Sequence, residues 1–289
     1  MPFVIDAPAK INLTLEILSR RKDGYHTLRS LMVPIAFGDT LRVEPSERFA
    51  FSCDDAALAS EENLAARAVR ALALSQPHAV HLAKRTPTQA GLGGGSSDAA
   101  AVLRAAMDGA FGMLGDRDYL AIARTLGSDV PFFLCGSGAL VEGTGERVTA
   151  VGALPDWHLL IVKPPVAVST RDAYARLDET SRPTRPRAGS ASLRALEALQ
   201  RGDFDALEAL LTNDFHDPIA SATPEVALTV EALLAAGATN ALLCGSGSAV
   251  FSLAPEASAI AALADRLVVP EGYRQYRTRF APTPGWRPA

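Results

Sequence analysis

A glycine-rich segment in the first half of the chain carries the residues best suited to bind an anion. It runs from Pro87 to Ser97 as PTQAGLGGGSS, and the alanine-rich stretch that follows predicts a helix. Glycines let backbone N–H groups approach an anion closely, and a helix N-terminus adds unpaired donors and a positive dipole. The spacing is not that of the Walker A loop, because no lysine precedes Ser96. Nor does a suitably placed acidic residue complete a dinucleotide fingerprint. The segment therefore predicts a phosphate cradle rather than a flexible turn.

A lysine and an asparagine stand at alternate positions of an apolar stretch near the N-terminus, within APAKINL. In a strand, residues i and i+2 point to the same face, so we expect Lys10 and Asn12 to project together. A lone lysine is more often on the solvent face of an edge strand. However, an ammonium group also suits a phosphate or a carboxylate partner. Lysine is scarce here, with four among 28 basic residues: Lys10, Lys22, Lys84 and Lys163.

Three further places are weaker candidates. Asp129 precedes an apolar run in GSDVPFF, where it could be a helix N-cap, a partly buried base or a metal ligand. Gly245 opens a Gly-Ser-Gly-Ser turn that could bind an anion. Tyr25 and His26 follow an Asp-Gly turn signal, and such a pair is usually surface or packing. None of these places decides a function alone.

Strands and helices must position these residues. The pattern predicts strands at residues 4–17, 28–35, 40–43, 79–85, 139–151, 157–164 and 273–280. It predicts helices at residues 61–74 with Ser60 as N-cap, and at 99–107, 116–126, 192–202, 203–213, 224–237 and 256–267. Prolines, a glycine and arginines predict a loop over residues 181–190. The sequence is therefore of mixed α+β type.

Composition excludes several classes of protein. The 289 residues carry 28 basic and 32 acidic side chains, so no global positive field would draw the chain onto nucleic acid or an anionic membrane. The three cysteines have neither disulfide-scaffold nor zinc spacing, which favours a reducing compartment. The N-terminus lacks a signal-peptide pattern, and no apolar run is long enough to span a bilayer. We expect a cytoplasmic protein with a small-molecule substrate, no nucleic acid partner and no membrane partner; the oligomeric state is left open.

Taken together, the motifs resemble those of the GHMP kinase superfamily. Their order is PAKIN, DGYH, GLGGGSS, GSDVPFF and a late GSG, and the resemblance runs from Ala7 to about Phe251. GLGGGSS alone would indicate only the superfamily, whereas PAKINL, DGYH and SDVPFF resemble the members of the non-mevalonate route to isoprenoids. The resemblance implies a two-lobed α+β fold with the active site in the cleft between an N-terminal and a C-terminal domain. We expect these domains at residues 1–155 and 156–289.

The resemblance also implies a reaction and its residues. ATP, as its Mg²⁺ complex, would phosphorylate the tertiary 2-hydroxyl of a cytidine-diphosphate-linked methylerythritol. The family's catalytic pair falls on Lys10 and Asp129, and its adenosine-side contacts fall on Asn63 and Lys84. Its substrate-binding residues fall on Asn12, Tyr25, His26, Thr170 and Tyr174. Its nucleotide loop falls on Pro87, Thr88, Gln89, Ala90, Gly91, Leu92, Gly93, Gly94, Gly95, Ser96 and Ser97. The chain departs from the family pattern at residues 88–90, where a more glycine-rich stretch is expected, and at Asp98, where asparagine is common.

These roles form a coherent mechanism. Asp129 would accept the proton of the attacking hydroxyl, and Lys10 would keep Asp129 ionised and stabilise charge at the reacting oxygens. Tyr25 and Tyr174 would sandwich cytosine, with His26 reading its polar edge. Either Ser96 or Ser97 would contact the metal, and the sequence does not decide between them, so no metal ligand is assigned. Lys22 and Lys163 are expected on the surface.

Other functions compete with this interpretation. The chain could be another small-molecule kinase of the superfamily, such as a homoserine or mevalonate kinase, which would lack the cytidine site. It could be a catalytically inactive nucleotide-binding regulator, although the presence of both Lys10 and Asp129 argues against that. A nucleic-acid-binding module is disfavoured by the net charge of -4 and the lack of a basic aromatic stripe.

Overall fold

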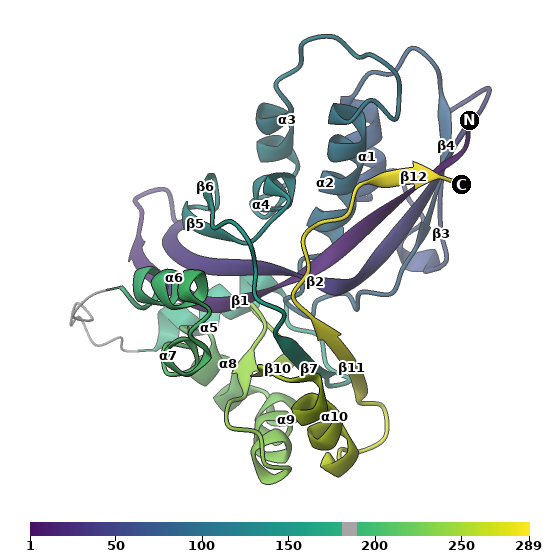
Figure 1. The fold of residues 1–289 in the computed structure, drawn as a ribbon. Helices are drawn as coiled ribbons and strands as arrows, with labels where there is room; N and C mark the ends of the chain where they lie inside the picture. Colours follow the sequence, from purple (N-terminus) through teal and green to yellow (C-terminus); the bar gives the residue numbers. More distant parts are fainter. Residues whose placement is uncertain (181–189) are drawn as a thin grey trace.

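The chain folds around a hairpin of two long strands (Figure 1). β1 spans Phe3–Arg20 and β2 spans His26–Pro45, so the strands predicted in this region are confirmed, and the second and third of them are one continuous strand. A turn at Asp23-Gly24 joins β1 to β2, and Gly24 adopts a φ of 87°, which glycine allows without strain. The structure, a computed structural model, describes residues 1–180 and 190–289.

The hairpin belongs to the first of two sheets. Within the described residues this sheet has eight strands in the order β12-β1-β2-β4-β3, with β5 beside β2, β6 beside β5 and β8 beside β1. The shorter strands are β3 (Ala50–Cys53), β4 (His78–Ala83), β5 (Ala139–Gly143), β6 (Arg147–Ala150), β8 (Thr212–Asn213) and β12 (Trp286–Pro288). Since β12 pairs with β1, the two chain ends lie close together, as Figure 1 also shows.

Four helices pack against the first sheet: α1 (Leu64–Ala71), α2 (Gly94–Met107), α3 (Tyr119–Leu126) and α4 (Val130–Cys135). The alanine-rich stretch forms the predicted helix, α2, which is buried along most of its length. Alanine suits this position because it favours the helix and lets neighbouring elements approach closely. α2 begins inside the glycine-rich segment, so the fold places that segment at a helix N-terminus.

The predicted N-cap of α1 is wrong. Ser60 lies in a turn before the helix, and its carbonyl accepts a hydrogen bond from the Asn63 N–H. The cap is Asn63, whose Oδ1 accepts from the backbone N–H of Ala65 at 2.9 Å. The helix starts later than the sequence suggests because the turn formed by residues 60–63 competes with the first helical turn.

The second sheet has the order β11-β7-β10-β9 in the part of the chain that is described. Its strands are β7 (His158–Lys163), β9 (Leu242–Leu243), β10 (Val250–Ala254) and β11 (Arg274–Arg279). The helices of this half are α5 (Thr170–Glu179), α6 (Ala191–Arg201), α7 (Phe204–Glu208), α8 (His216–Ala222), α9 (Pro224–Ala235) and α10 (Ala257–Arg266).

One predicted helix of this half is wrong at its C-terminal end. The pattern over residues 203–213 predicts a single helix, but α7 ends at Glu208 and the chain continues into β8. β8 pairs with Thr14 and Leu15 of β1, so pairing with a distant strand overrides a local helical preference. The loop predicted over residues 181–190 lies almost entirely outside the described residues.

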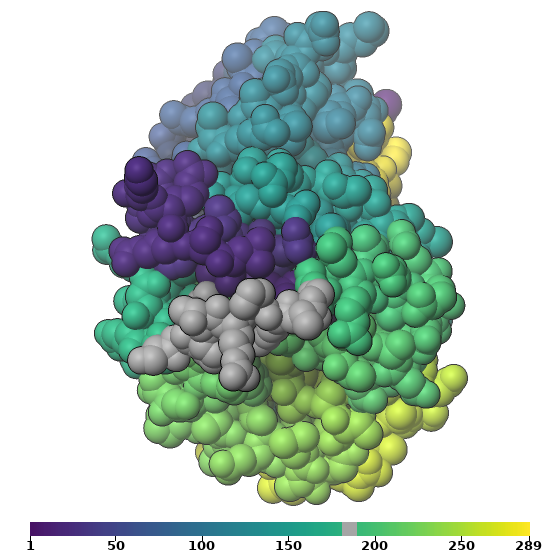
Figure 2. Space-filling model, turned by 90° about the vertical axis from the view of Figure 1, so that its left-hand side faces the viewer, coloured from purple at the N-terminus to yellow at the C-terminus, as the bar shows by residue number. Residues whose placement is uncertain are grey.

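A shared core connects the two lobes. Ile11 and Leu13 of β1 belong to the same buried cluster as Ile161 of β7 and Phe251 of β10. Viewed from the side in Figure 2, the N-terminal strands lie between the rest of the first lobe and the second lobe. The fold is therefore the two-lobed α+β arrangement that the sequence predicts. The division at residues 155 and 156 stays a prediction.

Candidate active site

A large cavity opens where the two lobes meet. Its volume is about 680 Å³, within the usual range for sites that bind small molecules. Most of the residues proposed for chemistry or binding line it: Lys10, Asn12, Asn63, Lys84, residues 87–96, Asp129, Thr170 and Tyr174. Residues as distant in the sequence as Lys10 and Gly247 thus share one surface. Ser97, Tyr25 and His26 are not among the described residues that line it.

Lys10 lies in the buried part of this site, with 4% of its surface exposed. Its Nζ donates to Asn12 Oδ1 at 2.7 Å, which confirms that the two side chains share a face of β1. Asn12 in turn donates to Ser30 Oγ at 2.8 Å, so the acceptor of the ammonium group is itself held in place. Burial lowers the pKa of Lys10, and the Asp129 carboxylate opposes that shift.

Asp129 stands at the start of α4 with its carboxylate free of the usual capping role. Its side chain accepts no capping hydrogen bond, although it occupies the N-cap position. Its Oδ2 is 3.9 Å from Lys10 Nζ, and 38% of the side chain is exposed. A carboxylate that faces a cavity beside a buried ammonium group can take a proton from a bound molecule.

The second glycine turn packs against the glycine-rich loop. A Cβ on Gly91, which has a φ of 75°, would lie 1.7 Å from the Cys244 carbonyl oxygen, so only glycine allows this approach. The N–H groups of Ser248 and Ala249 donate to carbonyls of the loop. A Cβ on Gly245 would lie 2.9 Å from Lys10 Nζ. The Gly-Ser-Gly turn therefore supports both the loop and the lysine.

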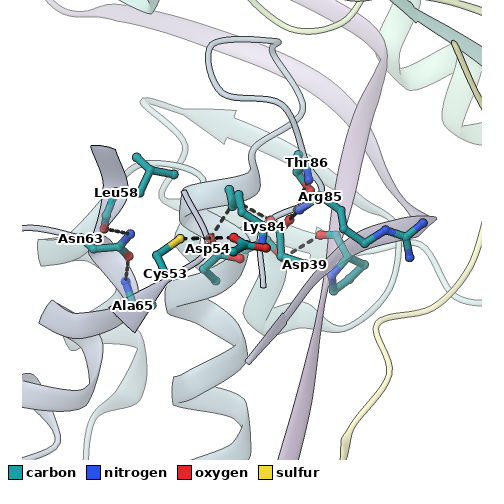
Figure 3. A network of polar contacts seen from close by, with 12 residues as sticks. Asp39, Cys53, Asp54, Leu58, Asn63, Ala65, Lys84, Arg85 and Thr86 are labelled. Atoms are coloured by element: carbon teal, nitrogen blue, oxygen red, sulfur yellow. Dashed lines mark hydrogen bonds and ion pairs between the residues drawn. The ribbon is translucent and has the colours of Figure 1, made fainter. Parts of the chain in front are cut away.

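On the opposite side of the loop, Lys84 is paired rather than free. Its Nζ lies 2.5 Å from Asp39 Oδ2 and 2.8 Å from Asp98 Oδ2. Figure 3 shows Asp39 and Lys84 close together, and in the same view Asn63 with its own partners, Leu58 and Ala65. Asn63 uses its side chain to cap α1 and to donate to the Leu58 carbonyl. Both proposed adenosine-side residues thus have structural partners while they line the cavity.

At the other end of the cavity, Tyr174 lies between two other rings. His26 stacks on Tyr174 with ring centroids 4.8 Å apart and an interplanar angle of 17°. Phe215 meets Tyr174 edge-on at 4.9 Å. Tyr25, on the hairpin tip, is 68% exposed. The structure therefore brings His26 against Tyr174, and the predicted pairing of Tyr25 and Tyr174 around a base stays a prediction.

Thr170 and Ser97 also have defined positions. Thr170 begins α5, and its Oγ1 lies 3.2 Å from Ser246 Oγ in the second glycine turn. Ser97 is buried and donates its hydroxyl to the Pro8 carbonyl at 2.6 Å. Ser96 lines the cavity, so it is the serine of the pair whose position suits a ligand or metal.

The expectation that Lys163 lies on the surface is wrong. Only 9% of its surface is exposed, and its Nζ donates to the carbonyls of Pro164 and Val166. The ammonium group of Lys163 donates to two carbonyl groups of the turn that follows β7. Its position at the end of an apolar strand gives no sequence signal of these partners. Lys22 is exposed, as expected.

Sequence reasoning missed several lining residues. Phe215, Ser30 and Met32 all face the cavity. Strand alternation could have identified Ser30 and Met32 as lining residues, because residues two apart on β2 share a face, and that face lies beside Lys10. No sequence pattern identifies Phe215, since it precedes a short helix far from any motif.

Magnesium fits this site only together with a ligand that supplies oxygens. No group of three or more His, Cys, Asp or Glu side chains suited to a metal occurs in the described part of the chain. Mg²⁺ commonly uses one or two protein oxygens and the phosphates of a nucleotide. Asp129 and Ser96 offer such oxygens on the cavity wall.

Across the described residues, no helix is long and apolar enough to cross a membrane.

Comparison with known proteins identifies relatives along nearly the whole chain. The family described as GHMP kinases N terminal domain matches residues 63–137, and GHMP kinases C terminal matches residues 195–269. The chain is 43% identical to a 4-diphosphocytidyl-2-C-methyl-D-erythritol kinase of Deinococcus radiodurans, over 90% of this chain and 88% of the relative. It is 40% identical to the protein of that name from Symbiobacterium thermophilum, over 91% and 94% of the two chains.

Solved structures give the same result for the fold. A crystal structure of 4-(cytidine 5'-diphospho)-2C-methyl-D-erythritol kinase superposes with a TM-score of 0.76 and 36% identity, covering 96% of this chain and 99% of the other. A homoserine kinase from Cytophaga hutchinsonii has a TM-score of 0.69 at 19% identity, over 99% and 96% of the two chains. The second likeness concerns the fold alone.

Proposed function

This chain belongs to the GHMP kinase family, and we infer that it phosphorylates the 2-hydroxyl of 4-diphosphocytidyl-2-C-methyl-D-erythritol with ATP. The observation that carries the inference is the placement of Lys10 and Asp129 beside the glycine-rich loop, in a cavity with an aromatic group at its other end. Each part matches one part of the reaction: a base for an alcohol, a cradle for phosphates and a stacking surface for a nucleobase.

Lys10 and Asp129 would perform the proton transfer. A tertiary alcohol is a poor nucleophile until its proton has an acceptor, and the exposed carboxylate of Asp129 can accept it as the oxygen attacks the γ-phosphorus. The positive charge of Lys10 favours the ionised form of Asp129. One N–H of Lys10 bonds Asn12, which leaves two to stabilise negative charge on the transferring phosphoryl group.

The glycine-rich loop would bind the triphosphate of ATP. Its glycines give phosphate oxygens close access to backbone N–H groups at the start of α2. We propose that magnesium enters as the ATP complex, with the Ser96 hydroxyl as the protein oxygen nearest to it. When bound, the ion neutralises phosphate charge. Asn63 and Lys84 are proposed to face the adenosine, from the positions at which they line the cavity.

The aromatic end of the cavity would hold the cytosine. Tyr174 and Phe215 line it, and His26 stacks on Tyr174, so a base could bind by displacing His26 or by extending the stack. Tyr25 is exposed on the hairpin tip and would have to close over the base. Asn12 and Thr170 are proposed to contact the methylerythritol and diphosphate part.

An acceptor panel tests the proposal. The purified protein is incubated with ATP, magnesium and one of three alcohols: the cytidine diphosphate compound, homoserine or mevalonate. We expect ADP release with the first alone, because only that alcohol carries a base for Tyr174 to stack on. Phosphorylation of homoserine or mevalonate in its place would contradict the proposal and favour another small-molecule kinase of the family.

The setting of the reaction is also proposed. The three cysteines, Cys53, Cys135 and Cys244, are free thiols, which supports the predicted cytoplasmic location. Burial raises the pKa of the Cys244 thiol to about 12, so it stays neutral near Lys10. The predictions that the protein binds no nucleic acid and no membrane stay predictions, and its oligomeric state is left open.

A further inference from the structure

Three ionisable side chains from different elements meet below the glycine-rich loop. Lys84 follows β4, Asp39 belongs to β2 and Asp98 lies in the first turns of α2. Lys84 Nζ is 2.5 Å from Asp39 Oδ2 and 2.8 Å from Asp98 Oδ2. The three side chains are 8%, 0% and 2% exposed, in the order Lys84, Asp39, Asp98. We refer to them as the triad.

The triad also fixes the backbone that leads into the loop. Asp39 Oδ1 accepts hydrogen bonds from the N–H groups of Arg85 at 2.6 Å and Thr86 at 2.7 Å. Figure 3 shows these bonds, with Asp39 facing Lys84, Arg85 and Thr86. Both oxygens of Asp39 are therefore used. Asp98 uses Oδ2 for Lys84, while its Oδ1 is buried without a hydrogen-bond partner in the structure.

The glycine-rich loop begins and ends beside the triad. Residues 84–86 precede the glycine-rich segment, and Asp98 follows it directly. A Cβ on Gly94 would lie 2.9 Å from Lys84 Nζ, so the lysine lies directly against the first turn of α2. A glycine-rich loop has many accessible conformations, and binding a phosphate to it costs conformational entropy. Holding both ends reduces that cost before the ligand arrives.

We propose that Asp39 and Asp98 are positioning residues for the nucleotide: through Lys84 they close the base of the glycine-rich loop and hold its N–H groups ready for the triphosphate. This rests on the proposed function, in which ATP binds that loop. The triad touches no reacting atom in this account. Its effect should appear in the affinity for ATP and not in that for the acceptor alcohol.

Apart from the other two members of the triad, the surroundings of Asp98 are largely apolar. Burial raises the pKa of Asp98 to about 8, against the opposing effect of Lys84. The charged groups that face Asp98 are Lys84 and Asp39, and Asp54 accepts from the Lys84 N–H nearby. The surfaces of α1, α3, α4 and β1 that pack around α2 contribute mainly alanine, leucine, valine and phenylalanine.

Asparagine at position 98 keeps the size of the side chain, and its amide oxygen can still accept a hydrogen bond from Lys84. D98N should therefore hold the base of the glycine-rich loop as wild type does, whereas D98A should not.

A purely structural triad is the competing explanation. Removing one partner of a buried ion pair destabilises a protein regardless of function. A matched control is the pair of Arg29 and Glu142, in which Arg29 Nε lies 2.8 Å from Glu142 Oε1 and joins β2 to β5. Neither of these two side chains is among the described residues that line the cavity.

The experiment measures ATP binding by calorimetry without acceptor, the KM of each substrate, and Tm, for wild type, D98A, D98N and E142A. We expect D98A to raise the Kd of ATP at least about fivefold, which is within the usual coupling between residues of one salt-bridge network. D98N should bind ATP like wild type, because the amide oxygen replaces the carboxylate oxygen as acceptor for Lys84. E142A should lower Tm and leave the Kd of ATP unchanged, and no variant should change the KM of the alcohol.

Two results would overturn the proposal. One is a D98A protein that binds ATP as wild type does, or whose KM values for both substrates rise in proportion to its loss of Tm, as a structural role predicts. The other is a D98N protein that binds ATP as weakly as D98A does, since the acceptor for Lys84 would then not be what holds the loop. Wild-type protein that binds no ATP would instead overturn the proposed function, and the proposal with it.

Discussion

The substitution D129N tests the assignment of the base. Asparagine keeps the size of the side chain and can still occupy an N-cap position, but it cannot accept a proton. Loss of a general base typically lowers the rate about 10²–10⁴-fold, so we expect kcat to fall by that factor. ATP affinity should change little, because the carboxylate is placed at the acceptor hydroxyl.

The same substitution should shift the titration of Lys10. At the observed 3.9 Å, an effective dielectric constant of 20 gives an attraction of about 4 kcal/mol. Solvent screening at the Asp129 side chain, which is 38% exposed, reduces this attraction to about 1 kcal/mol. Burial already lowers the pKa of Lys10, and removing Asp129 lowers it further. The alkaline limb of residual kcat/KM should therefore move to lower pH.

Steady-state ADP release from pH 6 to 10 measures both effects. The matched control is D118N, because Asp118 caps α3 through the Ala121 N–H and asparagine caps equally well. D118N should keep the wild-type profile. A D129N protein with wild-type kcat would refute the role of Asp129 as base, and an unshifted alkaline limb would refute its coupling to Lys10.

Three further substitutions probe the other parts of the site. G93V should raise the Kd of ATP about tenfold or more. The φ of 71° at Gly93 costs a branched residue about 1–2 kcal/mol, and its Cβ would lie 3.1 Å from Lys10 Cε. An unchanged affinity for ATP, measured by calorimetry, would argue against the phosphate cradle. Y174A should raise the KM of the cytidine substrate about 10-fold, because base stacking contributes ~1–3 kcal/mol to binding, and should leave the KM of ATP unchanged. Equal changes in the two KM values would contradict the assignment of the cytosine end. S96A should raise the magnesium concentration needed for half-maximal rate, measured by titration, whereas an unchanged requirement would remove Ser96 as a metal contact.

Local patterns in the sequence predicted much of the site because strand and helix periodicity place neighbours reliably. The alternation of Lys10 and Asn12 placed both on one face of β1, and the hydrogen bond between them confirms it. The glycine-rich segment before an alanine-rich stretch predicted a loop at a helix N-terminus, where α2 begins. These features depend on residues within a few positions of one another.

Features that depend on tertiary packing were not predictable in this way. Asp39, Lys84 and Asp98 meet because three elements distant in sequence converge, and no local pattern marks Asp39 as their partner. The sequence predicts Lys163 on the surface, because the turn after β7, which supplies its two carbonyl partners, leaves no local pattern around the lysine. The stacking of His26, rather than Tyr25, on Tyr174 depends on how the hairpin tip meets α5.

The central claim is that the chain transfers phosphate from ATP to the tertiary 2-hydroxyl of the cytidine diphosphate compound. The most direct measurement is ³¹P NMR of the product formed from that compound, ATP and magnesium by the purified protein. We predict one new phosphomonoester resonance, coupled to the quaternary C2 of the methylerythritol, beside an intact diphosphate and one equivalent of ADP. A phosphate on a primary or secondary hydroxyl, or ADP released without a phosphorylated product, would contradict the account.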